Sequence, residues 1–487
     1  MKIALINPRV ESYSSTLPPI GLLYIAAVLE RGGFKVRVFD IHPCDDRDIP
    51  NLLSYDPDIV GMTVLTDYWS RAKHIADIIH KNLGGSLFVA GGVHVTVQPE
   101  QGIRELDAHV GVLGEGEYTM LELCRHLADG SDWRDTKGIV FRDATGYMVN
   151  TPPRPYIQDL DELPPPARHL LTFENYLVPP GIIRGHWSEK STTVMTSRGC
   201  PFSCIWCGSN CTFGRKVRYR SVDNVLDELE LLVRNYSIDT IWFCDDTFTL
   251  LKSRVLEFCE KILDRGIKLN WGCQAHIKTA DEEMFKAMKK AGLVQLDFGV
   301  ESGSDNVLKG LKKKSDAESI QHAFKIAKRA GVRTLATFMF GNPSEKEEDI
   351  EATFKLAKTI NPNFVSSYFL TPYPGTELMQ MIEANKWKIT GDRDSHGLKK
   401  GPMLQIYFSD EELIDIRKRF QRTFVLRNFF SVVSNPIYLF RIISLLCRYP
   451  GGILRGMRRF MRTLVFDDLF FEFLNYYVEK RNTRSFF

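Results

Sequence analysis

Three closely spaced cysteines are the residues of this sequence best suited to chemistry. Cys200, Cys204 and Cys207 form the pattern Cys-x3-Cys-x2-Cys. Thiolates are the soft ligands that iron–sulfur clusters need. Three of them leave one iron of a [4Fe–4S] cluster open to a chelating small molecule. The spacing therefore predicts a [4Fe–4S] cluster with an open iron.

A structural zinc site is the alternative interpretation of the same loop, since Cys211 is available as a fourth thiolate. Zinc sites commonly carry paired Cys-x2-Cys units, and only Cys204 and Cys207 have that spacing. We therefore expect Cys211 to stand outside the metal site and the remaining cysteines to be core residues.

The elements that position the cysteine loop alternate between strand and helix patterns over residues 188–388. The strand TTVMTS runs into the loop, and later strands such as DTIWFCDD and LVQLDFGVES end in polar residues. Six strand–helix repeats of this kind predict a partial (β/α)6 barrel, whose chemistry sits at the carboxyl ends of the strands. A barrel of this size is open to a large partner or substrate.

The cysteine loop resembles that of the radical SAM superfamily, because an aromatic residue, Trp206, precedes the third cysteine and the loop follows the first barrel strand. The resemblance implies that the open iron binds the amino and carboxylate groups of S-adenosylmethionine (SAM). Reduction then yields methionine and a 5′-deoxyadenosyl radical. It also implies contacts to SAM from strand-end and loop residues, although an acidic residue alone is more often a cap. These candidates are Phe202, Trp206, Gly208, Asp245, Asp246, Glu301 and Ser302.

Residues 1–145 also alternate strand and helix patterns, which predicts a doubly wound parallel sheet of the Rossmann-like class. Ligands of such sheets bind beyond the carboxyl ends of the strands. The segments PPIGLLY, DIVGMTVLT, GGVHVT and VLGEGE resemble the cobalamin-binding domain that precedes many radical SAM domains. The resemblance implies cobalamin contacts at Pro19, Thr63, Leu65, Thr66, Gly91, Gly92, His94, Gly114 and Glu115.

One departure from that family concerns the cobalt ligand. Many cobalamin proteins carry Asp-x-His-x2-Gly, whereas Asp40-Ile41-His42 here lacks the glycine and follows the second strand. We therefore predict cobalamin without a histidine ligand, His42 as a surface loop residue, and His94 as a residue that orders its loop near the corrin. A doubly wound domain without a cofactor is the competing interpretation.

Two further segments complete the predicted organisation. Residues 146–187 are rich in proline, which predicts an extended connector. Residues 389–487 read as a helical segment in which arginines alternate with aromatic residues. That segment is interpreted as helices packed on the barrel with a basic outer face, as an amphipathic surface for anionic lipid or a greasy substrate, or as a nucleic-acid surface.

Composition narrows these alternatives. The chain of 487 residues carries 63 basic and 60 acidic residues, a net charge of +3, so no nucleic-acid partner is expected. The residues after Met1 read as a buried strand rather than a secretion signal, and no apolar run is long enough to span a membrane. Ten cysteines without a disulfide framework fit a reducing compartment. We expect a cytoplasmic protein, with membrane association left open.

Taken together, these resemblances imply a cobalamin-dependent radical SAM enzyme. Its commonest reaction would be methylation of an unactivated carbon, with SAM as methyl source and cobalamin as carrier. An oxidative cyclase, like the anaerobic magnesium-protoporphyrin monomethyl ester cyclases, and a cofactor-binding sensor without turnover are the alternatives. The expected partners are a small-molecule or lipid-like substrate and an electron donor such as ferredoxin or flavodoxin.

Overall fold

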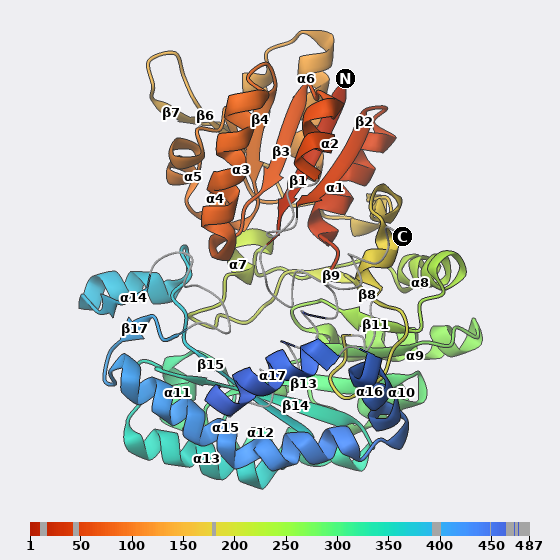
Figure 1. Ribbon diagram of the computed structural model, residues 1–487, viewed down its shortest axis with the longest axis vertical. Helices are drawn as coiled ribbons and strands as arrows, with labels where there is room; N and C mark the ends of the chain where they lie inside the picture. The colour runs from red at the N-terminus through yellow and green to blue at the C-terminus, as the bar shows by residue number, and fades with distance from the viewer. Residues whose placement is uncertain are drawn as a thin grey trace.

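The computed structural model describes residues 1–9, 17–41, 48–177, 182–391, 401–448 and 450–463, together with Glu472 and Tyr476. Two α/β units stack on one another, the amino-terminal unit above and the barrel below, with the short helix α7 (Ser209–Phe213) between them (Figure 1). The predicted order of a doubly wound unit, a partial barrel and carboxyl-terminal helices is confirmed.

The amino-terminal sheet has seven strands in the order β2-β1-β3-β4-β5-β6-β7. Strands β1 to β5 are parallel, as predicted, while β6 and β7 form an antiparallel hairpin at one edge. This hairpin was not predicted, and it extends the sheet to Asn150. Its turn is held by Asp143, whose carboxylate accepts hydrogen bonds from the backbone of Thr145 and Tyr147. The strands are β1 Lys2–Pro8, β2 Lys35–Ile41, β3 Ile59–Thr63, β4 Leu87–Gly91, β5 Val110–Val112, β6 Ile139–Arg142 and β7 Met148–Asn150.

Alternation along the strands covers both faces of this sheet. Ile3 and Leu5 of β1 pack in a core with the helices α1 (Ile20–Arg31) and α6 (Glu117–Asp129). Their neighbours Ala4 and Ile6 pack on the opposite face with α3 (Trp69–Asn82) and α5 (Pro99–Leu106). Successive side chains of a strand point to opposite faces, so a run of apolar residues covered on both sides is typical of a parallel sheet.

The second sheet has six parallel strands in the order β15-β14-β13-β12-β11-β8. Helices cover its outer face, and the core between them contains every second residue of each strand, such as Leu296, Phe298 and Val300 of β13. The strands are β8 Ser191–Val194, β11 Thr240–Phe243, β12 Asn270–Ala275, β13 Leu293–Glu301, β14 Arg333–Phe340 and β15 Phe364–Phe369. The helices are α8 Val222–Tyr236, α9 Lys252–Asp264, α10 Glu282–Lys290, α12 Ala317–Arg329 and α13 Glu347–Ile360.

The proline-rich connector is packed rather than merely extended. Leu160 and Leu163 belong to the core of the amino-terminal unit, while Phe173 and Tyr176 belong to the barrel core. The connector therefore ties the two units together, because its apolar residues between the prolines are buried on both.

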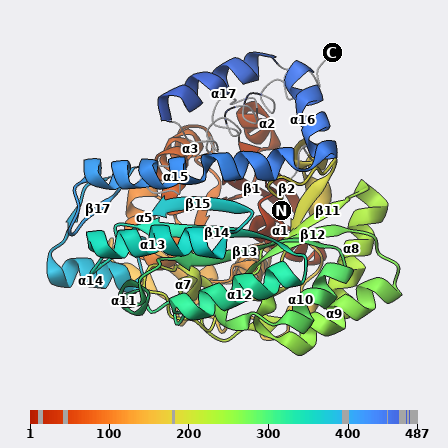
Figure 2. The ribbon, with the colours of Figure 1, turned by 90° about the horizontal axis from the view of Figure 1, so that it is seen from below.

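The carboxyl-terminal helices lie across the barrel (Figure 2). Helix α15 (Asp410–Val433) buries Phe420 against Phe338, Phe340 and Phe354, with ring centroids 4.9 to 5.2 Å apart. Helices α16 (Pro436–Arg448) and α17 (Pro450–Thr463) follow. Among the described residues, no single helix is long and apolar enough to cross a membrane; α15 and α16 meet this criterion only as a pair bent by 97°.

Candidate active site

The cysteine loop begins where the short strand β9 (Ser197–Arg198) ends, paired with β10 (Arg218–Tyr219). Gly199 follows with φ +95°, and a Cβ there would lie 2.7 Å from the carbonyl oxygen of Lys216. Glycine is therefore required for the close approach of the two backbone segments. Further along, the buried Ile205 fixes the loop, since its amide donates to the carbonyl of Leu311.

The three predicted cluster cysteines lie together and partly exposed at the end of the barrel. Burial raises the pKa of Cys207 to about 11, and the neighbouring Cys204 and Cys200 contribute in the same direction. The Sγ atom of Cys211 instead donates to the carbonyl of Gly375 at 3.2 Å. Within the described ranges, no three His, Cys, Asp or Glu side chains converge closely enough for one metal ion. Three neighbouring thiols are the donor set that a [4Fe–4S] cluster with one open iron needs.

A lysine, Lys313, lies at this site and was not among the residues predicted from the sequence. Its Nζ atom lies 2.9 Å from Oε1 of Glu301 and 5.7 Å from the ring centroid of Trp206. Burial lowers the pKa of Lys313, but Glu301, Cys204 and Cys207 raise it by a larger amount. The pKa is therefore raised overall, and the ammonium stays charged. A positive charge here favours thiolates and a negatively charged cluster.

Glu301 has a left-handed backbone, φ +66°, at the carboxyl end of β13. Strain of this kind persists only where the surroundings enforce it, and it is concentrated at functional sites. Gly299 makes room for the side chain, because a Cβ there would lie 2.3 Å from Oε1 of Glu301. The carboxylate is therefore aimed along the inner face of the barrel, on the same side as the cluster loop.

The two aspartates after β11 have different surroundings. Asp245 is buried and accepts hydrogen bonds from the amide of Thr196 at 2.6 Å and from the hydroxyl of Ser197 at 2.7 Å. Its carboxylate thus supports the strand that leads into the cysteine loop. Asp246 is partly exposed, and its carboxylate accepts a hydrogen bond from the hydroxyl of Ser209. Burial is the main cause that raises the pKa of Cys200, and Asp246 raises it as well. Of the pair, Asp246 is the residue directed toward the cluster side.

The remaining predicted SAM residues are also located. Phe202 stacks on the ring of His276, with centroids 3.7 Å apart and planes at 10°. Burial and the nearby Lys313 lower the pKa of His276 to about 3, so this imidazole is neutral. Gly208 caps α7. Ser302 is fully buried, with its hydroxyl 3.2 Å from that of Thr353 and thus turned away from the inner face.

Water reaches the inner face of the barrel sheet. Gln274 of β12 is exposed, and its partner in β13, Asp297, is partly exposed on the same face. Asp297 accepts a hydrogen bond from Gln295 at 2.8 Å, and burial raises the pKa of its carboxyl to about 7. Arg184 of the connector donates to Ser366 at 2.8 Å near the start of β15, and so lies toward the amino ends of the strands. The inner face is therefore a polar, hydrated surface that leads to the cluster loop.

The predicted cobalamin residues gather at the carboxyl ends of the amino-terminal strands. Pro19 begins α1, while Thr63, Gly91 and Gly114 end or follow β3, β4 and β5. Gly92 has φ +92°, and a Cβ there would lie 2.8 Å from the carbonyl of Val64. Glycine is therefore required here for the close approach of this loop to the backbone that follows β3.

His94 is part of the same edge. It is buried, its Nδ1 lies 3.1 Å from the hydroxyl of Thr66, and its ring packs on Trp69 with centroids 4.5 Å apart. These contacts hold His94 within its loop, and its place near the corrin stays a prediction. Leu65 beside it is exposed. His42 lies outside the described residues.

Buried ion pairs join this edge to the cluster loop. Arg198, two residues before Cys200, pairs with Glu115 at 2.8 Å and with Glu117 at 2.6 Å. Arg218 pairs with the second oxygen of Glu115 at 2.8 Å. The carboxylate of Glu115 is thus engaged between the two units, and its predicted contact with cobalamin stays a prediction for the surrounding loop.

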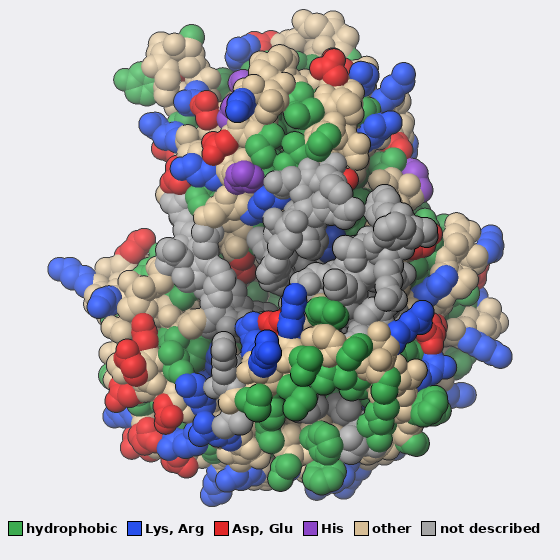
Figure 3. Space-filling model, viewed as in Figure 1, with side chains coloured by type: hydrophobic (Ala, Val, Ile, Leu, Met, Phe, Trp, Pro, Cys, Tyr) green, Lys and Arg blue, Asp and Glu red, His purple; other side chains and the backbone are tan. Residues whose placement is uncertain are grey.

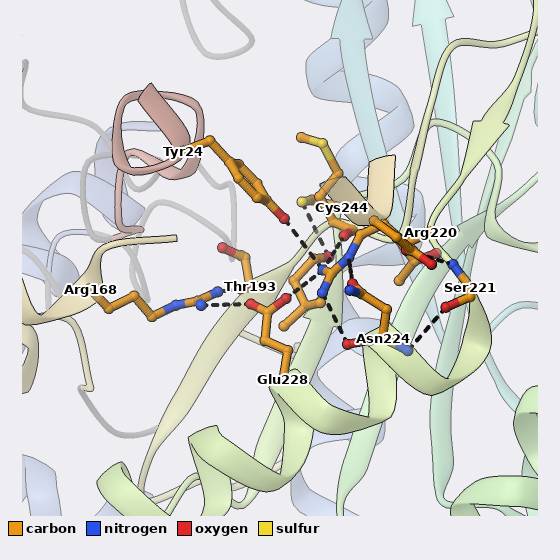
Figure 4. A network of polar contacts seen from close by, with 12 residues as sticks. Tyr24, Arg168, Thr193, Arg220, Ser221, Asn224, Glu228 and Cys244 are labelled. Atoms are coloured by element: carbon orange, nitrogen blue, oxygen red, sulfur yellow. Dashed lines mark hydrogen bonds and ion pairs between the residues drawn. The ribbon is translucent and has the colours of Figure 1, made fainter. Parts of the chain in front are cut away.

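A second buried network ties the connector to both units (Figure 4). Glu228 of α8 lies between Arg168 of the connector and Arg220, and Arg220 also donates to the hydroxyl of Tyr24 at 3.3 Å. Burial raises the pKa of Glu228, but Arg168 and Arg220 lower it by more. The carboxylate therefore stays ionised and fixes the two arginines.

The two units consequently meet through the carboxyl ends of their strands. The turn after β15 touches the amino-terminal unit, with the Tyr373 hydroxyl 3.4 Å from the carboxylate of Asp67. Next to it, a Cβ on Gly375 would lie 2.8 Å from Val97. The predicted cobalamin residues and the predicted cluster residues therefore face one another across this junction.

Comparison with known proteins agrees with this arrangement. Residues 194–357 match the radical SAM superfamily, and residues 6–124 match the B12 binding domain. The chain is 35% identical over 440 residues to the uncharacterized methyltransferase PH0819 of Pyrococcus horikoshii. The match covers 88% of this chain and 93% of that protein.

Two further proteins are similar. The anaerobic magnesium-protoporphyrin IX monomethyl ester cyclase of Rubrivivax gelatinosus is 30% identical over 398 residues, 78% of this chain and 70% of its own. The solved cobalamin-dependent SAM radical enzyme OxsB, with aqua-cobalamin and SAM bound, matches 99% of this chain and 79% of its own with a TM-score of 0.73. At 18% identity this last likeness shows the fold.

Proposed function

Because the chain belongs to the cobalamin-dependent radical SAM methyltransferase family, we propose that it transfers a methyl group from SAM, by way of cobalamin, to an unactivated carbon of a small molecule. The observation that carries the proposal is the junction between the two units. The loops predicted to contact cobalamin lie opposite the cysteines predicted to hold the cluster, and Arg198, Glu115 and Glu117 join the two. Both cofactors would then serve one reaction space.

The side chains of this chain have distinct roles in the proposal. When bound, the reduced cluster supplies the electron that cleaves SAM, and cobalamin carries the methyl group. Cys200, Cys204 and Cys207 would hold the cluster, while the contact with Lys313 would orient Glu301 toward the ribose of SAM. We propose ferredoxin or flavodoxin as the electron donor.

We further propose a lipid-like substrate, taken up beside a membrane. Support comes from the helices α15 to α17, which present apolar side chains such as Phe430 and Phe440 to solvent on the barrel unit. A lipid-like substrate has to leave the membrane and enter the barrel. An exposed apolar surface next to the barrel would provide the path.

Isotope tracing tests the proposed reaction. Protein purified without oxygen and supplied with iron, sulfide and cobalamin is reduced and incubated with methyl-deuterated SAM and a membrane lipid extract. We expect 5′-deoxyadenosine, S-adenosylhomocysteine, and a product heavier by one deuterated methyl group. Formation of 5′-deoxyadenosine with product that never carries the label would contradict methyl transfer.

Oxidative cyclisation is the second candidate, favoured by the 30% identity to a cyclase. Its product would lose hydrogen and gain no carbon. The same mass measurement therefore separates the two reactions, since only methylation adds one CH₂.

A further inference from the structure

More than half of the exposed large hydrophobic side chains of the described residues lie between Leu426 and Met461. They come from the end of α15 and from α16 and α17, and the space-filling view shows hydrophobic side chains gathered over this part of the barrel unit (Figure 3). We call these residues the apolar face. They are Leu426, Phe429, Phe430, Ile437, Phe440, Ile443, Leu454, Met457 and Met461.

Helical spacing shows that the apolar face of α17 points away from the protein. Leu454, Met457 and Met461 share one side of the helix and are 61%, 47% and 65% exposed. The buried positions of α17, Gly452 and Gly456, lie on the other side. The helix therefore buries its glycines and turns three of its large apolar residues outward, while Ile453 and Phe460 are partly buried.

Helix α16 repeats this arrangement. Ile437, Phe440 and Ile443 are 66%, 73% and 49% exposed, whereas Tyr438, about a third of a turn from Ile437, is 2% exposed and faces the protein. Two successive helices thus present apolar residues to solvent. A contiguous patch of this kind on a water-facing protein marks an interaction site.

The charges of these helices indicate the partner. Helices α16 and α17 contain no Asp or Glu, and every charged residue in them is an arginine. Arg448 and Arg458 are exposed, and Arg441 pairs with Glu189 of the barrel unit. Glu472 pairs with Arg459, so this arginine is neutralised as Arg441 is. Apolar residues accompanied by the remaining exposed arginines complement a surface that is apolar inside and negatively charged outside, as an anionic lipid leaflet is.

We propose that the apolar face docks on anionic lipid headgroups, with α16 and α17 lying in the plane of the membrane interface. The phenyl and aliphatic groups enter the acyl boundary, and Arg448 and Arg458 contact lipid phosphates. This inference deepens the proposed lipid-like substrate, because docking would bring the barrel to the phase that holds it. It needs no catalytic step, so it stands or falls separately from methyl transfer.

Vesicle flotation tests the proposal with the full-length chain. Vesicles of phosphatidylcholine alone are compared with vesicles that also contain phosphatidylglycerol, at low and high salt. We expect flotation with the phosphatidylglycerol vesicles that high salt weakens. The double variant Arg448→Gln/Arg458→Gln should bind them about tenfold or more weakly.

The apolar part is tested by Phe440→Ser combined with Met457→Ser. Its control is Leu231→Ser with Leu263→Ser on helices α8 and α9, since these leucines are also exposed, by 41% and 42%, and lie outside the apolar face. We expect the first pair to abolish flotation and the control to keep it, with unchanged circular dichroism in both. Equal flotation on both vesicle types, no flotation, or a dimer in solution that Phe440→Ser dissociates would overturn the proposal.

Discussion

The Nζ atom of Lys313 lies 2.9 Å from Oε1 of Glu301, and both side chains are nearly buried beside the cluster cysteines. Glu301, whose backbone is strained, contacts the middle lysine of the run Lys312-Lys313-Lys314. The pair fixes a carboxylate where the ribose of SAM is expected, and it adds a positive charge next to the thiols.

Replacing Lys313 by methionine should weaken SAM binding about tenfold, because Glu301 loses its charge-assisted hydrogen bond and its orientation. Equilibrium dialysis of reconstituted protein with labelled SAM measures this. Lys312→Met is the matched control, since Lys312 pairs with Glu377 at the surface. Equal losses in both variants would show that the Lys313 pair has no special role.

Replacing Cys204 by alanine should remove the cluster, because its thiol lies with those of Cys200 and Cys207. Cys211→Ala should keep a full iron complement, because the Cys211 thiol is bonded to the carbonyl of Gly375. Iron and sulfide analysis after anaerobic reconstitution decides between them. Loss of iron in Cys211→Ala would make it a fourth ligand.

Replacing Arg198 by methionine should lower the free energy of unfolding by about 3 kcal/mol or more. The buried carboxylates of Glu115 and Glu117 would each lose an ion pair. Arg142→Met removes an exposed pair with Asp107 and should cost under about 1 kcal/mol. Urea unfolding followed by tryptophan fluorescence measures both. Similar midpoints for the two variants would mean that the junction contributes little to stability.

Replacing Gly92 by alanine should impair cobalamin binding at least tenfold. Its backbone strain costs about 1–3 kcal/mol, and its Cβ would also lie 2.8 Å from the carbonyl of Val64. Gly33→Ala is the control, because Gly33 has φ +86° with nothing within 4 Å of the added Cβ. Cobalamin absorbance after gel filtration gives the readout, and unaltered binding in Gly92→Ala would place the cofactor elsewhere.

The Asp297 carboxyl should make stability fall as the pH rises. Burial raises the pKa of this carboxyl in the folded state to about 7 from an ordinary value of 3.8. Between these two pH values the folded protein keeps the proton on Asp297, whereas the unfolded chain has lost it. Stability from this group is full below about pH 4 and is lost by about pH 7, on the order of 1–2 kcal/mol once solvent screening is allowed for.

Asp297→Asn should remove that slope, which thermal unfolding from pH 5 to 7.5 measures as a difference from the unaltered protein. Glu345, whose pKa burial also raises to about 7, is present in both proteins and cancels. An identical pH dependence in the two would show that Asp297 titrates normally.

The order of the units, the parallel strands of both sheets and the cysteine motif could all be predicted from the sequence. Strand and helix periodicity, glycine turns and cysteine spacing are local signals that survive without a structure. His276 follows β12 as other polar residues follow their strands, so strand-end reasoning extended to every strand would have found it. The hairpin β6–β7 was missed because its strands are short.

Which polar residues contact one another could not be predicted from the sequence, because it depends on long-range packing. Lys313 stands in a run of lysines, and nothing in its neighbours distinguishes it from Lys312 until folding buries one against Glu301 and leaves the other at the surface. Glu115 and Asp245 have the sequence context of ligand residues, yet folding places Arg198 and Thr196 against them. The outward direction of Phe440 likewise depends on which side of α16 packs on the protein. Such choices follow from long-range packing and desolvation, which local patterns do not contain.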